Sequence, residues 1–293
     1  MADVAPWTWY VLAAAWGAIW GSFGNVVIHR LPARKSVVRP SSACPDCGKV
    51  IRWYDNVPVL SWIALRGRCR RCGWRIPIRY PLVELGSTLL SVMAVRSLLA
   101  GGPDELPLFL STFFIHFAFL WALLVLAVID LRTMLLPDAI TLPGVMLGLT
   151  FVLVTDRTRV LENAIASAGA YLVVLVFFVL LYRLVAKREG MGMGDAKLLA
   201  MIAALMGWKG AVFSLVGGAF LGLLVNLPVL VLRRKDDGGS GQDGEEEERS
   251  VLRAQLPFGP MLSLAAALYF FWGEEIVATY YGVVDRIVLS FMR

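Results

Sequence analysis

Charged side chains are scarce in this sequence. Of its 293 residues only 17% are charged, 58% are hydrophobic, and the mean hydropathy is +0.69. In an ordinary soluble domain about a quarter of the residues are charged, so this composition excludes an ordinary soluble domain. It favours a chain that lies mostly within a lipid bilayer.

Histidine is also rare, with two residues in the whole chain, His29 and His116. A zinc protease needs a histidine-rich site with an open coordination position, and a serine or cysteine protease needs a histidine with a triad partner. Neither histidine has such partners in the sequence. We expect His29 to lie at the membrane interface and His116 to pack within a span. A glycine fingerprint for dinucleotides after a strand is absent as well.

Long apolar runs dominate what is present. Those long enough to cross a bilayer, or nearly so, predict an all-α polytopic membrane protein with about eight transmembrane helices. The first run lacks a basic n-region and a cleavage site, so we expect a retained helix. The predicted spans are Trp7–Val27, Pro81–Leu99, Leu106–Ile129, Ala139–Val154, Ala164–Val185, Ala196–Gly207, Ala211–Leu232 and Phe258–Trp272.

Basic residues predict the orientation of these spans. Placing the N-terminus outside puts 22 of the 28 Lys and Arg residues on the inner side, and the outer loop "GGPDELP" has none. Cytoplasmic loops are enriched in Lys and Arg, so we expect the large loop after the first span to be cytosolic. The surplus of six positive charges therefore reflects topology, and we expect no nucleic-acid partner.

The four cysteines all lie in this basic loop, as "CPDC" (Cys44, Cys47) and "CRRC" (Cys69, Cys72). Two C-x-x-C pairs can close a tetrahedral Zn²⁺ site. Disulfides are disfavoured in a cytosolic loop. Four thiolates leave no open position for water, so we predict a structural zinc that supports a small cytosolic domain between the first two spans.

Two carboxylates stand at the ends of apolar spans. Asp130 closes the third span, and Asp195 opens the sixth after Gly192 and Gly194. An acid in a membrane span is costly and is a functional candidate by default. Asp195 could instead be a helix N-cap, as we expect for Asp138. Asp130 lies at the negative end of a helix dipole, where a carboxylate needs another justification.

A pair of nearby carboxylates shares one proton, and this suggests an aspartic peptidase. The helix N-terminus favours ionised Asp195, and the helix C-terminus favours protonated Asp130. We hypothesise that Asp195 activates water and that Asp130 donates a hydrogen bond to the scissile carbonyl.

Several motifs, in order, resemble the type IV prepilin peptidases, the bifunctional leader peptidase/N-methyltransferases of aspartic peptidase family A24. The resemblance covers most of the chain. It rests on the paired C-x-x-C and on "GSFGNVVIHRLP" (21–32), "IRWYDNVPVLSW" (51–62), "RYPLVEL" (79–85), "DLRTMLLPD" (130–138), "EGMGMGDAKLL" (189–199) and "PFGP" (257–260).

The resemblance implies a peptidase of the bacterial inner membrane that cuts the short basic leader of type IV prepilins or pseudopilins after a glycine, at the cytosolic face. It makes Asp130 and Asp195 the catalytic pair, with Gly192, Gly194 and Lys197 as supporting motif residues. It also implies methylation of the new N-terminus from S-adenosylmethionine in the N-terminal half. The candidate residues for that activity are Asn25, His29, Arg30 and Glu84, although Glu84 could instead pair with Arg79 or snorkel.

We therefore expect the chain to be divided by function. The parts are a first transmembrane helix (1–28), a zinc-binding domain (29–80) within a methyltransferase-associated region (1–100), a peptidase membrane domain (106–272), an acidic linker (233–256) and an unassigned tail (273–293). Membrane lipid surrounds the spans. The main alternative is a non-catalytic zinc-knuckle scaffold for pilus or secretion assembly, which would explain the cysteines but not the two acids.

Overall fold

The structure is a computed structural model that describes residues 5–101, 105–176, 192–236 and 257–291. The described residues fall into two compact units, one within Met1–Phe151 and the other within Val152–Arg293. These units reflect packing, whereas the predicted domains were divided by function. The predicted domain boundaries therefore stay predictions.

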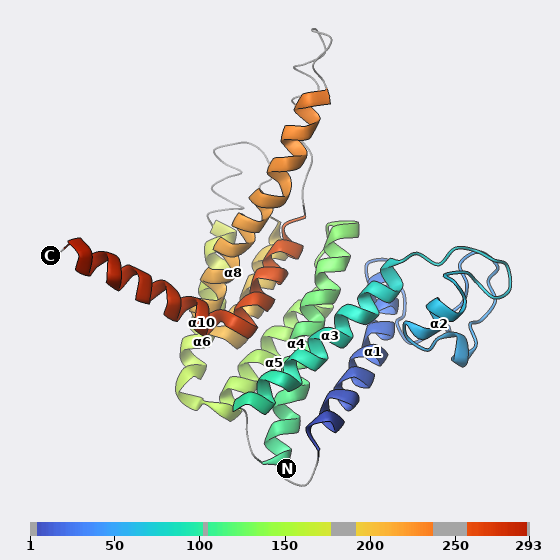
Figure 1. Ribbon diagram of the computed structural model, residues 1–293, viewed down its shortest axis with the longest axis horizontal. Helices are drawn as coiled ribbons and strands as arrows, with labels where there is room; N and C mark the ends of the chain where they lie inside the picture. The colour runs from blue at the N-terminus through green and yellow to red at the C-terminus, as the bar shows by residue number, and fades with distance from the viewer. Residues whose placement is uncertain (1–4, 102–104, 177–191, 237–256, 292–293) are drawn as a thin grey trace. The chain divides into compact units, whose positions relative to one another are not determined.

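Helices make up the secondary structure of both units, apart from two isolated β-bridges in the described residues. The first unit contains α1 (Pro6–Arg30), η1 (Trp53–Asp55), α2 (Leu60–Ala64), α3 (Arg79–Gly101), α4 (Leu106–Thr133) and most of α5 (Asp138–Thr155) (Figure 1). The second contains η2 (Arg157–Arg159), α6 (Val160–Val173), α8 (Met193–Asp236) and α10 (Gly259–Phe291).

Within the described residues, six helical segments are long and apolar enough to cross a membrane, and Gly259–Gly273 is a shorter apolar helix. The prediction of an all-helical polytopic membrane protein is confirmed. Two predicted spans, 196–207 and 211–232, lie in the single element α8, which breaks at Gly207 (φ 69°, ψ −172°). Part of the predicted span 164–185 lies outside the described residues. The unassigned tail continues α10 as far as Phe291.

Small residues bring α1 and α3 close together. In lipid, association of helices depends on close packing and interhelical hydrogen bonds rather than on the hydrophobic effect. The Ser87 hydroxyl donates to the carbonyl of Gly17 and the Ser91 hydroxyl to that of Ala13, each at 2.7 Å. A Cβ on Gly17 would lie 2.7 Å from the backbone oxygen of Ser87, so only glycine fits there.

We expect Gly17→Ala to lower the free energy of unfolding by about 1–3 kcal/mol, because its methyl group must push the α3 backbone away. Gly86→Ala is the matched control on α3, since its Cβ would meet only Leu124 side-chain atoms at 3.5 Å. Alanine also improves helix propensity, so the control is expected to be neutral or stabilised by up to about 1 kcal/mol. Unfolding in detergent, followed by circular dichroism, compares the two; equal stability would contradict the close-packed interface.

Helix α4 packs against α1 and α3 in the first unit. The Trp121 indole N–H donates to the carbonyl of Trp20 on α1 at 2.9 Å. At the end of the unit where α1 ends, α3 begins and α4 ends, a buried apolar cluster joins the three helices. Its members are Val27, Ile28, Val83, Val125 and Ile129. This cluster fixes the turn of α4 that carries the neighbouring Asp130.

The second unit is built around the first half of α8. Residues 198–204 are buried on all sides, and polar side chains of α6 reach the carbonyls of this segment. The Ser167 hydroxyl donates to Ala200 O at 2.9 Å, and the Asn163 amide donates to Ala204 O at 3.2 Å, just before the break at Gly207. The Asn163 bond satisfies a carbonyl that the break deprives of its helical partner, and the Ser167 bond joins α6 to α8.

Candidate functional site

The cysteines lie on two tight turns of the same design. In each turn the N–H of a glycine with positive φ (Gly48, 68°; Gly73, 75°) donates to the carbonyl of the first cysteine at 2.9 Å. A left-handed backbone is easily adopted by glycine. The two C-x-x-C-G segments therefore present their sulfur atoms in the same way.

The four sulfur atoms of Cys44, Cys47, Cys69 and Cys72 all lie within 4.8 Å of one another. The Sγ atoms of Cys44 and Cys72 are 3.7 Å apart. A tetrahedral zinc with Zn–S bonds of about 2.3 Å separates its sulfur ligands by roughly 3.8 Å, so the cluster fits this ion. The predicted clustering of the cysteines is confirmed, and the donor set is one that zinc prefers.

The protonation of the thiols fits the same role. The backbone N–H groups of Cys72 and Arg71 lower the pKa of Cys69 to about 7. Although the Trp74 N–H lowers the pKa of Cys72, desolvation and the side chains of Cys69, Cys44 and Asp46 raise it to about 12. Ionisation of one thiol in the cluster therefore disfavours ionisation of its neighbour. A divalent cation removes the conflict, because a coordinating thiol is deprotonated outright.

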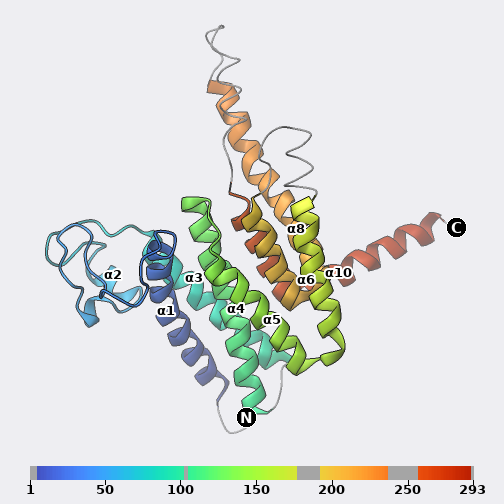
Figure 2. The same cartoon turned by 180° about the vertical axis from the view of Figure 1, so that it is seen from behind.

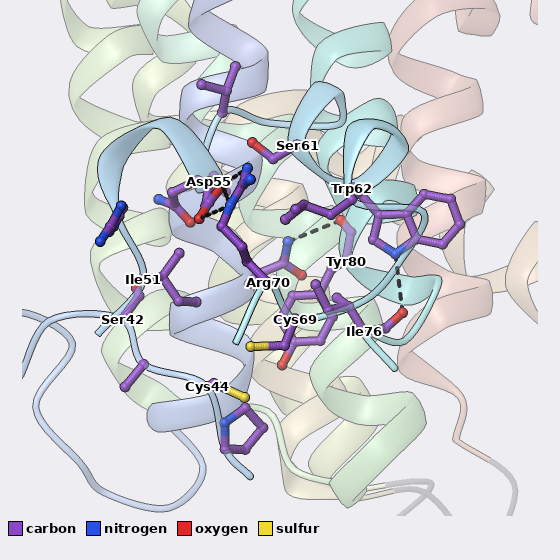
Figure 3. A pocket seen from close by; sticks show the side chains of 18 of the residues that line it. Ser42, Cys44, Ile51, Asp55, Ser61, Trp62, Cys69, Arg70, Ile76 and Tyr80 are labelled. Carbon is purple, nitrogen blue, oxygen red and sulfur yellow. Dashed lines mark hydrogen bonds and ion pairs between the residues drawn. The ribbon is translucent and has the colours of Figure 1, made fainter. Parts of the chain in front are cut away.

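A cavity of about 220 Å³ lies between this cluster and the helix ends (Figure 3). Its wall combines α1, the start of α3 and the loop that joins them, which we call the α1–α3 loop (residues 31–78). Cys44 and Cys69 line it, so the cysteine cluster borders the cavity directly. All four residues that the sequence suggested for methyl transfer, Asn25, His29, Arg30 and Glu84, line the cavity as well.

Glu84 is the buried carboxylate of this cavity, with 9% of its surface exposed. Its Oε2 atom accepts a hydrogen bond from the Val59 N–H at 2.7 Å. Ser22 and Asn25 of α1 lie beside the same carboxylate. The alternative partner, Arg79, lies instead over the ring of Tyr80, with its guanidinium carbon 5.2 Å from the ring centroid. Glu84 therefore belongs to the cavity and not to a surface ion pair with Arg79.

Val59 itself has a strained backbone. Its φ of 61° and ψ of −51°, with Leu60 N–H donating to Pro58 O at 2.6 Å, form a γ-turn of the positive-φ kind. This turn is rare, and it is most unusual for a β-branched residue. Sparsely populated backbone conformations cluster at functional sites. The turn directs the Val59 N–H toward the Glu84 carboxylate.

An ion pair connects the cysteine cluster to the far wall of the cavity. Arg70, between Cys69 and Cys72, donates to the Asp55 carboxylate through Nε at 2.9 Å and Nη2 at 2.7 Å (Figure 3). Its guanidinium carbon also lies 5.8 Å from the Tyr54 ring centroid. Two-pronged pairs of this kind fix geometry as well as charge. A shift of the second cysteine turn would therefore move the wall at Asp55.

Positive charge gathers at the mouth of the first unit. Arg30, Lys35, Arg79 and Arg132 surround His29. The Trp62 indole, on the opposite wall of the cavity, donates to Ile76 O at 3.1 Å and holds the loop against itself. Trp62, Trp74 and Tyr80 give the cavity aromatic walls beside its carboxylates.

Asp130 is buried in the last turn of α4, with 5% of its surface exposed. Its backbone carbonyl accepts the N–H of Met134, whose φ of 52° ends the helix. Asp130 therefore lies at the same end of the first unit as the cavity. The carboxylate position is set by the turn of α4 that packs, through Ile129, in the apolar cluster.

Asp195 is the third residue of α8 and is 8% exposed. Its Oδ2 atom accepts a hydrogen bond from the Gly192 N–H at 3.2 Å, and its own N–H donates to Gly192 O at 3.1 Å. This reciprocal pattern resembles the acidic member of a capping box rather than a simple N-cap. Lys197 is half-buried two residues further on. Asp130 and Asp195 belong to different units.

Sequence reasoning did not single out three residues of the cavity. Val59, Asp55 and Arg70 gain their roles from backbone geometry and from contacts across the loop. One signal was available for Asp55, because it is one of two acids among many basic residues of the loop and such an acid favours an ion pair. No pattern in the sequence indicates the γ-turn at Val59.

These features define a polytopic membrane protein with a four-cysteine loop over a cavity and two buried aspartates at helix ends. The model of the Bacterial Peptidase A24 N-terminal domain matches residues 15–98, and that of the Type IV leader peptidase family matches residues 117–227. The chain belongs to the type IV leader peptidase family. No solved structure matches it.

Similar proteins cover nearly the whole chain. A prepilin leader peptidase/N-methyltransferase of Aeromonas salmonicida is 32% identical, over 97% of this chain and 98% of its own length. Proteins with the same name from Pseudomonas putida and Pseudomonas aeruginosa are 36% and 33% identical, covering 94% and 90% of both chains. The resemblance drawn from the sequence motifs is confirmed.

Proposed function

We propose that this chain is a membrane-embedded prepilin leader peptidase and N-methyltransferase. Its substrates are type IV prepilins or pseudopilins, whose basic leader it removes after a glycine before methylating the new N-terminal amine. The observation that carries the proposal is the full-length similarity to proteins of that name, together with the separate buried acids Asp130, Asp195 and Glu84.

The orientation belongs to the same proposal. We place the chain in the bacterial inner membrane with its N-terminus outside and the α1–α3 loop in the cytosol. The distribution of Lys and Arg supports this placement. The mouth of the first unit, with Asp130, then faces the cytosol, where a basic leader would remain during cleavage.

Asp130 and Asp195 are proposed as the peptidase dyad. Two carboxylates that share one proton can activate water and polarise the scissile carbonyl without a metal ion. Asp195, near the positive end of α8, takes the proton from water, and Asp130, at the negative end of α4, donates its proton to the carbonyl oxygen. Gly192 precedes α8 and Gly194 is its second residue, and the Gly192 N–H holds Asp195 in place.

The cavity of the first unit is proposed as the methyltransferase site. Its aromatic side chains and carboxylates suit S-adenosylmethionine, whose sulfonium is a cation and whose adenine can stack. S-adenosylmethionine supplies the methyl group when bound. The Glu84 carboxylate, held by the Val59 N–H, orients the substrate amine and accepts the proton that the amine loses.

Glu84→Gln is expected to reduce methylation by roughly 10²–10⁴-fold, because the amide cannot accept the proton of the amine. Leader cleavage is expected to continue at the wild-type rate. Mass spectrometry of the product N-terminus separates the two activities. Glu105→Gln, at the exposed start of α4, is the control and should methylate normally. Normal methylation by Glu84→Gln would refute this role.

The proposed function as a whole is tested with the purified enzyme and a prepilin whose leader ends in glycine. Cleavage at that glycine, followed by methylation only when S-adenosylmethionine is added, is the expected result. An intact substrate, with the enzyme folded and zinc-loaded, would overturn the proposal and favour the scaffold interpretation.

A further inference from the structure

Three large apolar side chains are exposed in α2 and in the adjacent η1, which the Ser61 hydroxyl joins to α2 by donating to Tyr54 O at 3.0 Å. Trp53 is 82% exposed, Leu60 66% and Ile63 61%. Leu60 and Ile63 are three residues apart in α2 and therefore lie on the same side of it. We call these three residues the α2 face. A group of exposed apolar side chains marks an interaction site more strongly than single scattered ones do.

The α2 face is not part of the cavity. Ser61 and Trp62, the intervening residues of α2, line the cavity, whereas Trp53, Leu60 and Ile63 do not. The short helix therefore has two sides with different roles. One closes the proposed methyltransferase site, and the other is directed away from it.

The α1–α3 loop packs beside α1 instead of beyond its end. The cavity that it encloses is lined by Ser22, Asn25 and Val26, as well as by the last residues of α1. Ser22 lies eight residues before Arg30, which is about 12 Å along the helix at 1.5 Å per residue. Figures 1 and 2 show α2 to the side of α1.

This position brings the loop to the depth of the lipid headgroups. The 25 residues of α1 span about 37 Å, only slightly more than a hydrocarbon core of about 30 Å. A domain that flanks the last 12 Å or so of such a helix cannot stand clear of the bilayer. Tryptophan and aliphatic side chains are favoured at this depth.

The charge of the loop indicates which bilayer surface it fits. Ten Lys and Arg residues lie between residues 31 and 78, and all are exposed. Two acids oppose them, and one of these, Asp55, is paired with Arg70. Arg52 precedes Trp53, and Arg66 and Arg68 follow α2, so positive charge borders the α2 face. Anionic headgroups attract such residues.

The lipid-facing surface of α3 continues toward the loop. Leu82, Leu85 and Leu89 are exposed along one side of α3, and Ile78, just before the helix, is 62% exposed. Residues 78, 82, 85 and 89 follow the 3.6-residue period of one helix face. The apolar stripe that lipid covers on α3 therefore extends into the end of the α1–α3 loop.

We propose that the α2 face docks on the anionic lipid surface around the mouth of the first unit, with Trp53, Leu60 and Ile63 between the headgroups and the neighbouring arginines on lipid phosphates. This docking holds α2, and with it one wall of the cavity, at a fixed depth. It is independent of the catalytic roles proposed above.

The test uses the full chain, zinc-loaded, in nanodiscs of phosphatidylcholine with or without phosphatidylglycerol. Amide hydrogen exchange over residues 53–64 is expected to be roughly tenfold slower with phosphatidylglycerol, and salt should remove the difference. Lipids brominated near the glycerol should quench wild-type fluorescence more than that of Trp53→Phe, which isolates one tryptophan among the ten.

The variant Leu60→Ser/Ile63→Ser removes the apolar contact while changing only exposed side chains. It is expected to exchange at the rate seen without phosphatidylglycerol. Val38→Ser, at an equally exposed position (79%) of the same loop, is the control and should behave as wild type. Equal exchange in both lipids, or equal quenching in Trp53→Phe, would overturn the proposal. Protection that appears only when another protein is added would overturn it too and would assign the α2 face to a protein partner.

Discussion

Asparagine in place of Asp130 or Asp195 is expected to lower the rate of leader cleavage by roughly 10³–10⁴-fold, the scale of a general acid or base. Each substitution keeps the shape of the side chain but removes the exchangeable proton of the dyad. Either single substitution should lower the cleavage rate about as much as the double substitution does, because the effects of two groups that act as a unit are not additive. Single-turnover cleavage of a prepilin measures all three variants.

Two comparisons make this prediction specific. Asp138→Asn, in the first turn of α5 and the same sequence motif as Asp130, should cleave normally, because asparagine also caps a helix. Methylation of a pre-cleaved substrate should persist in the Asp130 and Asp195 variants, since Glu84 and the cavity are unchanged. Cleavage at the wild-type rate by either variant would show that its carboxylate only stabilises the helix end.

Loss of the cysteines that are predicted to bind zinc is expected to reduce methylation strongly. Cys69→Ser should release the ion and reduce methylation by more than about a hundredfold, because zinc supplies much of the folding energy of a small loop. Cys44 and Cys69 line the cavity, and Arg70 joins the second cysteine turn to Asp55. Disorder of the second cysteine turn would therefore disturb the cavity wall at the cysteines and the cavity wall at Asp55 together.

The measurement combines zinc content, methylation and cleavage on the same preparation. Cleavage is expected to fall far less, because α4 and α8 are held mainly by helix packing, although Leu31 and Val37 of the α1–α3 loop also pack against the apolar cluster beside Asp130. Chelation of zinc in the wild type should reproduce the loss, and added zinc should restore methylation to the wild type but not to Cys69→Ser. Full methylation without zinc would contradict a structural role for the cluster.

The sites proposed for the two activities hold acids in different surroundings. Glu84 is held by a backbone N–H in a cavity with aromatic walls, whereas Asp130 and Asp195 lie at helix ends. A single substitution is therefore expected to separate cleavage from methylation.

Much of the architecture could be predicted from the residues alone. Long apolar runs must form helices in a bilayer, because no other open structure satisfies its backbone there. Two C-x-x-C-G segments predict paired turns around one metal, since the chemistry and spacing of thiols are local properties. Asp130 and Asp195 were identifiable because an acid in an apolar span carries a high free-energy cost.

Other features depended on contacts between residues far apart in the chain. The hydrogen bond from Val59 to Glu84 spans 25 residues and needs a strained turn that no propensity predicts. The sequence ended one apolar run at Gly207, where the backbone of α8 is non-helical, but it did not indicate which side chain satisfies the carbonyls beside this break. Asn163, more than forty residues away, does so by donating to the carbonyl of Ala204.

The amino-acid sequence by itself determined that this protein is a helical membrane protein with a cysteine cluster, two candidate aspartates and the motifs of its family. These properties follow from composition, periodicity and local spacing. Only the tertiary structure decided that Glu84 faces a cavity and not Arg79, and that the four-cysteine cluster borders this cavity. It also decided that Trp53, Leu60 and Ile63 are exposed in a loop that flanks α1. The physical reason is that burial, hydrogen-bond partners and depth in the membrane are set by packing between distant segments, which no local pattern encodes.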